Sequence, residues 1–216
     1  LEPIQGESGA IIPPADFLRQ VREVCDERGA LMVLDEVQTG LGRTGRMWAF
    51  EHFGVVPDVM CIAKAVAGGV PMGVTVARAE VMDSLRTGEH STTFGGNSLA
   101  CAAASAVLDV IVEERLPDRA WEVGGYFKQR LQEELSGVKL VREVRGMGLM
   151  LAVELRFNLI PRVIPALASN GLLALYSGLN IVRLLPPLVI ERGEVDEAVE
   201  KIRDVLSAET GHALSR

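Results

Sequence analysis

The chain has 216 residues, a length that suffices for one sizeable core or for one domain and part of another. Hydrophobic residues make up 48% of the sequence and aromatic residues only 5%, which indicates an aliphatic α/β core and excludes a disordered protein. The net charge of −7 gives no support to nucleic-acid binding, and no stretch approaches the roughly 20 apolar residues of a membrane span.

Helix-forming and strand-forming segments alternate through the first half of the chain. In chain order, the expected elements are a helix over 15–28, a strand over 31–34, a glycine-rich loop over 39–45, a short helical segment over 47–53, a strand over 59–63, a strand over 74–77 and a short helix over 79–85. Pro13 and Pro14 precede the first helix, and Gly29 follows its last residue. Such alternation predicts a mostly parallel sheet, whose ligands bind at the carboxyl ends of its strands.

The pattern changes in the second half of the chain, where short strands and helices follow two long helices. The expected elements are helices over 97–114 and 119–135, separated by Pro117, then strands over 140–144, 149–154, 172–175 and 181–184, with helices near 161–169 and 193–206. This predicts two domains: residues 1–114 form part of a large α/β domain, and residues 115–216 form a smaller α+β domain.

Two polar residues stand at the ends of apolar strands. Lys64 follows the run 59–63 and precedes a small-residue turn, so its amine is expected in a glycine-lined cleft rather than in bulk water. A desolvated lysine loses part of its preference for the charged form and becomes a nucleophile toward an aldehyde. Asp35 ends the preceding strand. This pair suits a pyridoxal 5′-phosphate site, in which the lysine forms the Schiff base and the carboxylate keeps the pyridine nitrogen protonated.

Each of these residues also has a simpler interpretation. A single lysine after a strand is usually a solvated loop residue, and an aspartate at a strand end is often a polar stop or a helix N-cap. Lys64 and Asp35 together, in consecutive strand–turn units separated by one helix-sized segment, favour the cofactor site.

Two further features of the sequence carry chemistry. Thr92 and Thr93 precede a glycine pair and a helix, a place where hydroxyls and N–H groups hold a phosphate, although a capped helix start is the simpler interpretation. Arg183 lies in an otherwise apolar strand, and a buried arginine must be paired with a carboxylate. That pair is either a structural ion pair or part of a ligand site.

The three cysteines indicate the compartment. Cys25, Cys61 and Cys101 are widely spaced in apolar contexts, without the spacing of metal ligands. They are expected to be buried free thiols in a reducing compartment, and no signal peptide is visible. A cytoplasmic location without a metal site is therefore expected.

Four segments keep the order and spacing typical of one enzyme family, and a fifth lies near the end of the chain. They are 1–7 (LEPIQGE), 34–45 (LDEVQTGLGRTG), 63–65 (AKA), 90–97 (HSTTFGGN) and 182–188 (VRLLPPL). On these motifs the chain resembles the class III pyridoxal-phosphate aminotransferases, specifically the acetylornithine and ornithine branch. Members of the family are about twice as long. The resemblance therefore implies the C-terminal half of a fold-type I enzyme.

The resemblance also implies roles for individual residues. The catalytic residue would be Lys64, the cofactor contacts Asp35, Glu36, Val37, Gln38, Lys64 and Thr93, and the substrate contacts Thr92, Arg183 and Glu7. Val37 would pack on the cofactor ring and Gln38 near its phenolic oxygen, while Thr93 would hold the phosphate bound to the other subunit of a homodimer. Arg183 would bind the α-carboxylate of glutamate in a bidentate fork, with Glu7 as its resting partner.

The implied reaction moves the terminal amino group of an N-blocked ornithine or lysine to 2-oxoglutarate, giving a semialdehyde and glutamate, in arginine or lysine biosynthesis. The segment 151–158 looks more like the lysine-biosynthesis members, whose substrate is tethered to a small amino-group carrier protein. Acetylornithine is the nearest alternative donor, followed by free ornithine and 4-aminobutyrate. A different hypothesis is that the chain is an inactive part of such an enzyme, which keeps only the fold and the dimer contacts.

Overall fold

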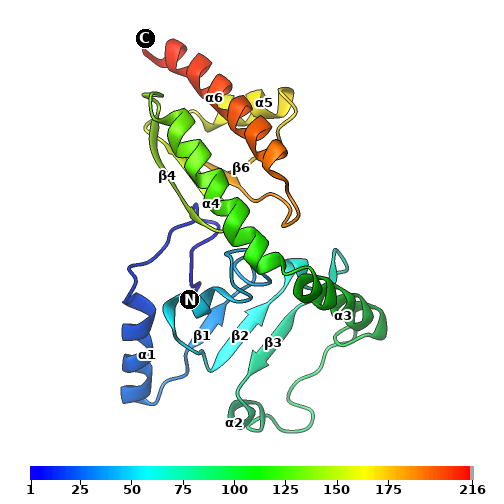
Figure 1. Cartoon of the computed structure of the whole chain (residues 1–216). Coiled ribbons are helices and arrows are strands. Elements are labelled where there is room, and N and C mark those ends of the chain that lie inside the picture. The colour runs from blue at the N-terminus through cyan, green and yellow to red at the C-terminus, as the bar shows by residue number, and fades with distance from the viewer. Residues whose placement is uncertain (215–216) are drawn as a thin grey trace. The chain divides into compact units, whose positions relative to one another are not determined.

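The computed structural model describes residues 1–214, with side-chain surroundings up to residue 210. The chain divides into two compact units (Figure 1). The first unit holds Leu1–Ile4 and Pro13–Pro117, and the second unit holds Gln5–Ile12 and the chain from Asp118 onward. A short N-terminal segment, residues 5–12, therefore belongs with residues that lie more than a hundred positions later in the sequence.

The first unit is built around a three-stranded sheet of order β1-β2-β3. Its elements are α1 (Phe17–Arg28), β1 (Val33–Asp35), the 3-10 helix η1 (Ala49–Phe53), β2 (Val59–Ile62), the 3-10 helix η2 (Lys64–Ala67), β3 (Val74–Ala77), α2 (Ala79–Met82) and α3 (Ser98–Glu113). The strand β1 is parallel to β2, whereas β3 is antiparallel to β2. The expectation of a mostly parallel sheet thus holds for one of these two pairings, because the connection over 63–73 reverses the chain without a crossover helix.

The first helix follows the expected start and stop signals. Helix α1 begins at Phe17, shortly after the two prolines, and ends at Arg28. Gly29 then adopts a left-handed conformation with φ of 63°, and its N–H donates to the carbonyls near the end of the helix. Leu18 is fully buried, so this helix attaches to the core of the first unit through its first turn.

The second unit is a four-stranded antiparallel sheet of order β4-β5-β7-β6 with three helices. Its elements are α4 (Leu116–Leu135), β4 (Val141–Met147), β5 (Met150–Leu155), α5 (Ile160–Ser169), β6 (Leu175–Ser177), β7 (Ile181–Leu184) and α6 (Arg192–Leu214). Buried hydrophobic side chains from α4, α5 and α6 pack with those of β5 and β7 into one core, which includes Phe127, Leu131, Val153, Leu167, Val182 and Ile202. This α+β unit carries Arg183 in the middle of its sheet.

Two features of the second half differ from the expectation. Pro117 does not separate the helices as a breaker; it occupies the first turn of α4, where its missing N–H has no intrahelical partner to lose. The strand expected over 172–175 is found at Leu175–Ser177, because pairing with β7 begins only at Leu175.

Candidate active site

Asp35 and Lys64 lie at the same edge of the first unit's sheet. The strands β1 and β2 are parallel, and Asp35 is the partner of Cys61 in their register. The N–H of Glu36 donates to the carbonyl of Cys61 at 2.9 Å, which extends the pairing one residue beyond β1. Lys64 follows two residues after the end of β2. The carboxyl ends of two neighbouring parallel strands therefore present a carboxylate and an amine together.

The carboxylate of Asp35 is exposed at this edge. One of its oxygens, Oδ1, accepts a hydrogen bond from the N–H of Val37 at 2.9 Å, so the side chain is turned along the chain that leaves β1. Such a contact orients a carboxylate without removing it from reach, because a carboxylate has four lone-pair positions. Val37 and Gln38, which follow, are half-buried.

Lys64 is the first residue of η2 and has a left-handed backbone conformation, with φ of 51°. This conformation is uncommon for a residue with a side chain and is found at functional sites more often than elsewhere. The expectation of a buried amine is wrong for this chain, because Lys64 is exposed. The strand ends before Lys64, and the following turn, which begins at the sheet edge, leaves its side chain open.

Glu36 differs from its neighbour Asp35, because its carboxylate is buried, with 1% of the residue exposed. It accepts hydrogen bonds from the hydroxyl of Thr39 and, at 2.9 Å, from the N–H of Phe50. Burial raises the pKa of the Glu36 carboxyl, although these hydrogen bonds favour its charged form. One oxygen of Glu36 is therefore engaged by the start of the glycine-rich loop and the other by η1, rather than at the edge that carries Asp35 and Lys64.

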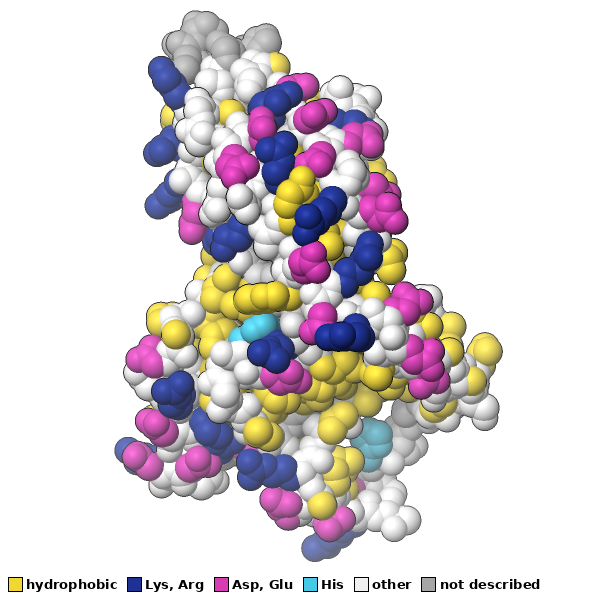
Figure 2. All heavy atoms as spheres, in the orientation of Figure 1, with side chains coloured by type: hydrophobic (Ala, Val, Ile, Leu, Met, Phe, Trp, Pro, Cys, Tyr) yellow, Lys and Arg dark blue, Asp and Glu magenta, His cyan; other side chains and the backbone are white. Residues whose placement is uncertain are grey.

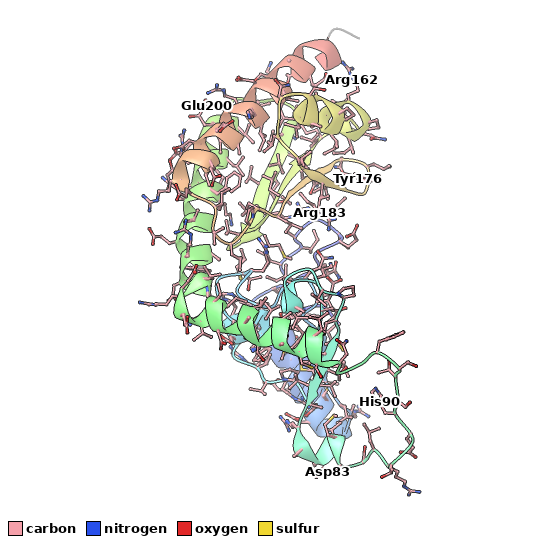
Figure 3. All side chains as sticks on the ribbon, turned by 90° about the vertical axis from the view of Figure 1, so that its right-hand side faces the viewer. Asp83, His90, Arg162, Tyr176, Arg183 and Glu200 are labelled. Carbon is pink, nitrogen blue, oxygen red and sulfur yellow. The ribbon has the colours of Figure 1, made fainter. Side chains whose placement is uncertain are left out.

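Thr92 and Thr93 lie on a segment that does not pack on the sheet. Every residue from Met82 to Leu99 is exposed, and Figure 3 shows the loop with His90 extending away from the neighbouring helices. At its end, Asn97 caps α3: its Oδ1 accepts from the N–H of Ala100 at 2.9 Å. The capped helix start is thus present, and the two threonine hydroxyls precede it on an open segment.

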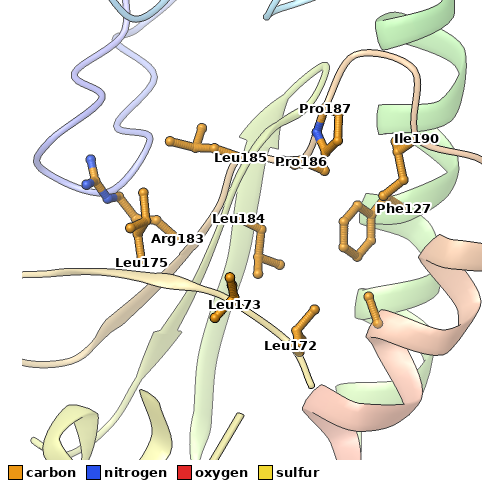
Figure 4. Close-up of a pocket in the computed structure, with 11 residues that line it drawn as sticks. Phe127, Leu172, Leu173, Leu175, Arg183, Leu184, Leu185, Pro186, Pro187 and Ile190 are labelled. Atoms are coloured by element: carbon orange, nitrogen blue, oxygen red, sulfur yellow. The ribbon is translucent and has the colours of Figure 1, made fainter. Parts of the chain in front are cut away.

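In the second unit, Arg183 is buried in β7 and paired as the sequence predicts. Its Nη1 donates to Glu7 Oε2 at 2.9 Å and to the carbonyl of Gly6 at 3.0 Å. Figure 4 shows the guanidinium directed toward the N-terminal loop. The pair is asymmetric, because the side chain of Arg183 is 9% exposed and that of Glu7 is 74% exposed. The buried Nε of Arg183 has no hydrogen-bond partner among the described residues.

A small apolar cavity of about 190 Å³ lies beside Arg183 and was not expected from the sequence. Figure 4 shows its lining, which includes Phe127, Leu172, Leu184, Leu185 and Pro186. The only sequence signal is the density of leucine and proline around β7, which is also typical of an ordinary core. The sequence likewise gave no signal for Ser177 and Arg145, whose side chains contact the loop that carries Glu7.

Among the described residues, no group of three or more His, Cys, Asp or Glu is placed to hold a metal ion. In the same part of the chain, no helix has the length and apolar character needed to cross a membrane.

Comparison with known proteins identifies the fold. Residues 1–206 match the family described as aminotransferase class-III. The acetylornithine aminotransferase of Methanothermobacter thermautotrophicus is 44% identical over 207 residues, which are 96% of this chain and 53% of that protein. Ornithine aminotransferase 2 of Staphylococcus aureus is 47% identical over 206 residues, 95% of this chain and 51% of that protein. The chain thus spans about half the length of the curated relatives it matches.

Solved structures agree with these relatives. The ornithine aminotransferase of Toxoplasma gondii superposes with a TM-score of 0.93 at 40% identity, over 98% of this chain and 51% of that one. The acetylornithine aminotransferase of Elizabethkingia anophelis gives a TM-score of 0.90 at 39% identity, over 95% of this chain and 55% of that one. A second T. gondii structure is described with partial occupancy of PLP at its active site.

Proposed function

The chain belongs to the class-III aminotransferase family, whose members are PLP-dependent, and we propose that the protein transfers the terminal amino group of an ornithine-type donor to 2-oxoglutarate. The observation that supports this most is the common edge of Asp35 and Lys64 at the carboxyl ends of two parallel strands. The same reaction requires one site to accept two different substrates, and the pair of Glu7 and Arg183 suits that requirement.

The residues at the edge fit pyridoxal 5′-phosphate. Asp35 offers an exposed carboxylate for a protonated ring nitrogen, and Lys64 offers an exposed amine to hold the cofactor covalently. Val37 and Gln38 would contact the ring, and Thr93 would hold the phosphate of the cofactor bound to the other subunit. When bound, the cofactor supplies an electron sink for the substrate carbon that carries the transferred nitrogen.

Lys64 would also move the proton in this reaction. An amine at the sheet edge is able to take a proton from the substrate carbon and return it at a neighbouring position, which is general acid–base catalysis. Its exposure in this chain leaves room for substrate. The left-handed backbone of Lys64 is consistent with this role, since strained residues are retained where their placement serves function.

Glu7 and Arg183 would form a substrate switch. In the first half-reaction, Glu7 neutralises Arg183, so the arginine does not attract the carboxylate of the wrong end of the donor. In the second, a carboxylate of 2-oxoglutarate replaces Glu7 and binds the guanidinium in a bidentate fork. The exposed side chain of Glu7 is free to leave, whereas the guanidinium of Arg183 is buried and stays in place.

The finer assignment concerns donor and assembly. The proposed donor is an N-blocked ornithine or lysine: either acetylornithine, or a lysine or ornithine bound to a small amino-group carrier protein. The reaction would serve arginine or lysine biosynthesis in the cytoplasm. The names of the relatives support ornithine-type donors.

We also propose a homodimer with shared sites, in which Thr92 and Thr93 serve the partner. The exposure of residues 82–99 in one chain supports this assembly.

Single-turnover kinetics of the two half-reactions test the proposed function in the full-length protein. Arg183→Gln should slow the reaction with 2-oxoglutarate at least about 100-fold, because charge-assisted hydrogen bonds are lost, and should leave the reaction with the amine donor much less affected. Arg142→Gln, at an exposed arginine of β4, is the matched control. Equal losses in both half-reactions would reduce Arg183 to a structural ion pair and overturn the switch.

A further inference from the structure

The loop over 5–12, which carries Glu7, is fixed to the second unit's sheet by side chains from three strands. Ser177 of β6 donates its hydroxyl to the carbonyl of Glu7. Arg145 of β4 donates Nε to the carbonyl of Gly9 at 2.9 Å, and Arg183 of β7 donates to the carbonyl of Gly6 at 3.0 Å. The three carbonyls that accept these bonds belong to Gly6, Glu7 and Gly9, and so lie within four consecutive residues of the loop.

The loop is also closed on itself and seated closely. Gln5 and Ile11 form an isolated antiparallel bridge, with N–H to carbonyl distances of 3.0 and 3.1 Å. Gly9 has φ of 97°, and a Cβ built on it would lie 2.7 Å from Cδ1 of Ile181 and 3.3 Å from Nη2 of Arg145. Glycine suits this position because residues with a side chain are strained at this φ, and a Cβ would also force the Ile181 side chain to shift.

The main chain of the loop and the side chain of Glu7 make different contacts. All three donors hold main-chain carbonyls, whereas the carboxylate of Glu7 bonds to Arg183 and is otherwise largely exposed. Departure of this carboxylate therefore breaks one ion pair and leaves the main-chain contacts of the loop in place. Arg183 keeps its bond to Gly6 as well, so the guanidinium does not need to be repositioned between the two half-reactions.

We propose that Ser177 and Arg145 are positioning residues of the substrate switch: they fix the main chain of the loop so that Glu7 returns to Arg183 whenever 2-oxoglutarate is absent. This inference rests on the proposed function. Ser177 is 4% exposed and the side chain of Arg145 is 11% exposed, so both donors act from protected positions. Glu154 holds Arg145 from the neighbouring strand β5 through an ion pair of 2.5 Å.

Arg145 has a matched control on its own strand. Arg142 also pairs with Glu154, at 2.9 Å, but its side chain is 65% exposed. Ser136 provides the control for Ser177, because its hydroxyl likewise donates to a main-chain carbonyl, that of Glu133, at the end of α4. Arg142→Gln and Ser136→Ala thus remove the same chemical groups without touching the loop.

Two readouts in the full-length holoenzyme test the proposal. One is hydrogen exchange of the loop's amides, and the other is the ratio of single-turnover rates with ornithine-type donor and with glutamate. Ser177→Ala should raise the exchange rate about fivefold and lower the donor-to-glutamate ratio about fivefold, as expected when one hydrogen bond is lost. Ser177→Thr should restore both, and Arg145→Gln should act in the same direction.

Glu7→Gln separates the anchors from the switch itself. It should change the rate ratio and leave loop exchange as in the wild type, because the main-chain contacts remain. Suppose that Glu7→Gln alters the donor-to-glutamate ratio as expected. The positioning role is then overturned if Ser177→Ala leaves the amide exchange of the loop unchanged, or if it speeds that exchange without changing the ratio. An unaltered ratio in Glu7→Gln would instead overturn the proposed switch, and the positioning role with it. Arg145→Gln also removes one of the two arginine partners of Glu154. If that variant does not fold, Ser177→Ala alone decides the test.

Discussion

The lysine at the sheet edge differs from Lys128 and Lys201 in what its amine contacts. Lys128 donates to the carbonyl of Gly146, and Lys201 pairs with Glu197 at 2.6 Å, whereas Lys64 is exposed beside Asp35's strand. Borohydride reduction of the full-length holoenzyme should therefore attach the cofactor covalently to Lys64, which peptide mapping detects as added mass on that residue. Lys64→Ala should reduce turnover by about 1,000-fold or more, since it removes the proposed acid–base group. Label on Lys128, Lys139 or Lys201 would contradict the assignment.

Asp35 is expected to affect chemistry more than cofactor binding. Asp35→Asn keeps a side chain of the same shape but removes the charge that would hold the ring nitrogen protonated. Turnover should fall about 100-fold, the size typical of losing one electrostatic contact at a reacting group, while cofactor absorbance is largely retained. Asp109→Asn, at an exposed position of α3, should change neither quantity. Equal loss of cofactor and turnover in Asp35→Asn would assign Asp35 to binding alone.

Because the Glu36 carboxyl is buried, we expect the free energy of unfolding to depend on pH. Burial raises its pKa above the value in the unfolded chain, so the fold favours the protonated carboxyl. The stability that this group contributes is fully present below the unfolded pKa of about 4.3 and is lost as the pH rises through the folded value. The melting temperature of the wild type should therefore fall relative to Glu36→Gln over that window. Glu80→Gln, at an exposed site, should follow the wild type. Parallel curves for Glu36→Gln and wild type would contradict the prediction.

The sequence predicted some features of the site and not others, for physical reasons. The strand-end placement of Asp35 and the pairing of Arg183 with Glu7 were expected, and the structure has both. The first follows from apolar runs with polar ends. For the second, the cost of burying an unpaired charge implies that Arg183 has a carboxylate partner, and the family resemblance implies that this partner is Glu7. The exposure of Lys64 and the contacts of Ser177 depend on residues far away in the sequence. No local pattern encodes such contacts.

At the level of elements, most helices were predicted and the strands were less accurate. Helices expected over 97–114 and 161–169 occur as α3 and α5, because apolar periodicity and caps are local signals. The strand expected over 172–175 was misplaced, since an apolar run does not reveal which of its residues find a partner. The direction of β3 also depends on the turn that precedes it rather than on its own composition.

Two adjacent glycines of α4 offer a paired test of helix packing. A Cβ on Gly124 would lie 2.1 Å from the carbonyl oxygen of Gly148, whereas a Cβ on Gly125 would meet nothing within 4 Å. Gly125→Ala should stabilise the fold by about 0.5–1 kcal/mol, because alanine favours the helix. Gly124→Ala should destabilise it, since the backbone of the β4–β5 turn must shift. Denaturant unfolding of both variants measures this, and similar effects of both would contradict the close packing of α4.

For the whole molecule, the exposed apolar side chains support the proposed homodimer. Those of the first unit include Val76, Met82, Leu85, Phe94 and Leu99, and Phe94 is 82% exposed. Figure 2 shows hydrophobic side chains gathered over the part that carries β1–β3, in contrast to the charged side chains around α4 and α6. Exposed apolar surface of this kind marks an interaction site.

Mixing two inactive variants tests shared sites directly. Full-length Lys64→Ala and Thr93→Val subunits, exchanged in equal amounts, should recover roughly a quarter of wild-type activity, since half of the dimers are hybrids and each hybrid has one intact site of two. A tagged subunit should first show that exchange has occurred. No recovery after proven exchange would place Thr93 and Lys64 of the same chain in one site.

The protein is proposed to move a terminal amino nitrogen from an ornithine-type donor to 2-oxoglutarate. The most direct measurement uses acetylornithine labelled with ¹⁵N only at its terminal amine, incubated with full-length enzyme, pyridoxal 5′-phosphate and 2-oxoglutarate. Mass spectrometry should find the label in glutamate, formed in equal amount to the semialdehyde, and Lys64→Ala should abolish this transfer. Semialdehyde without labelled glutamate, release of the label as ammonia, or no turnover of acetylornithine, ornithine or carrier-bound lysine would contradict the claim.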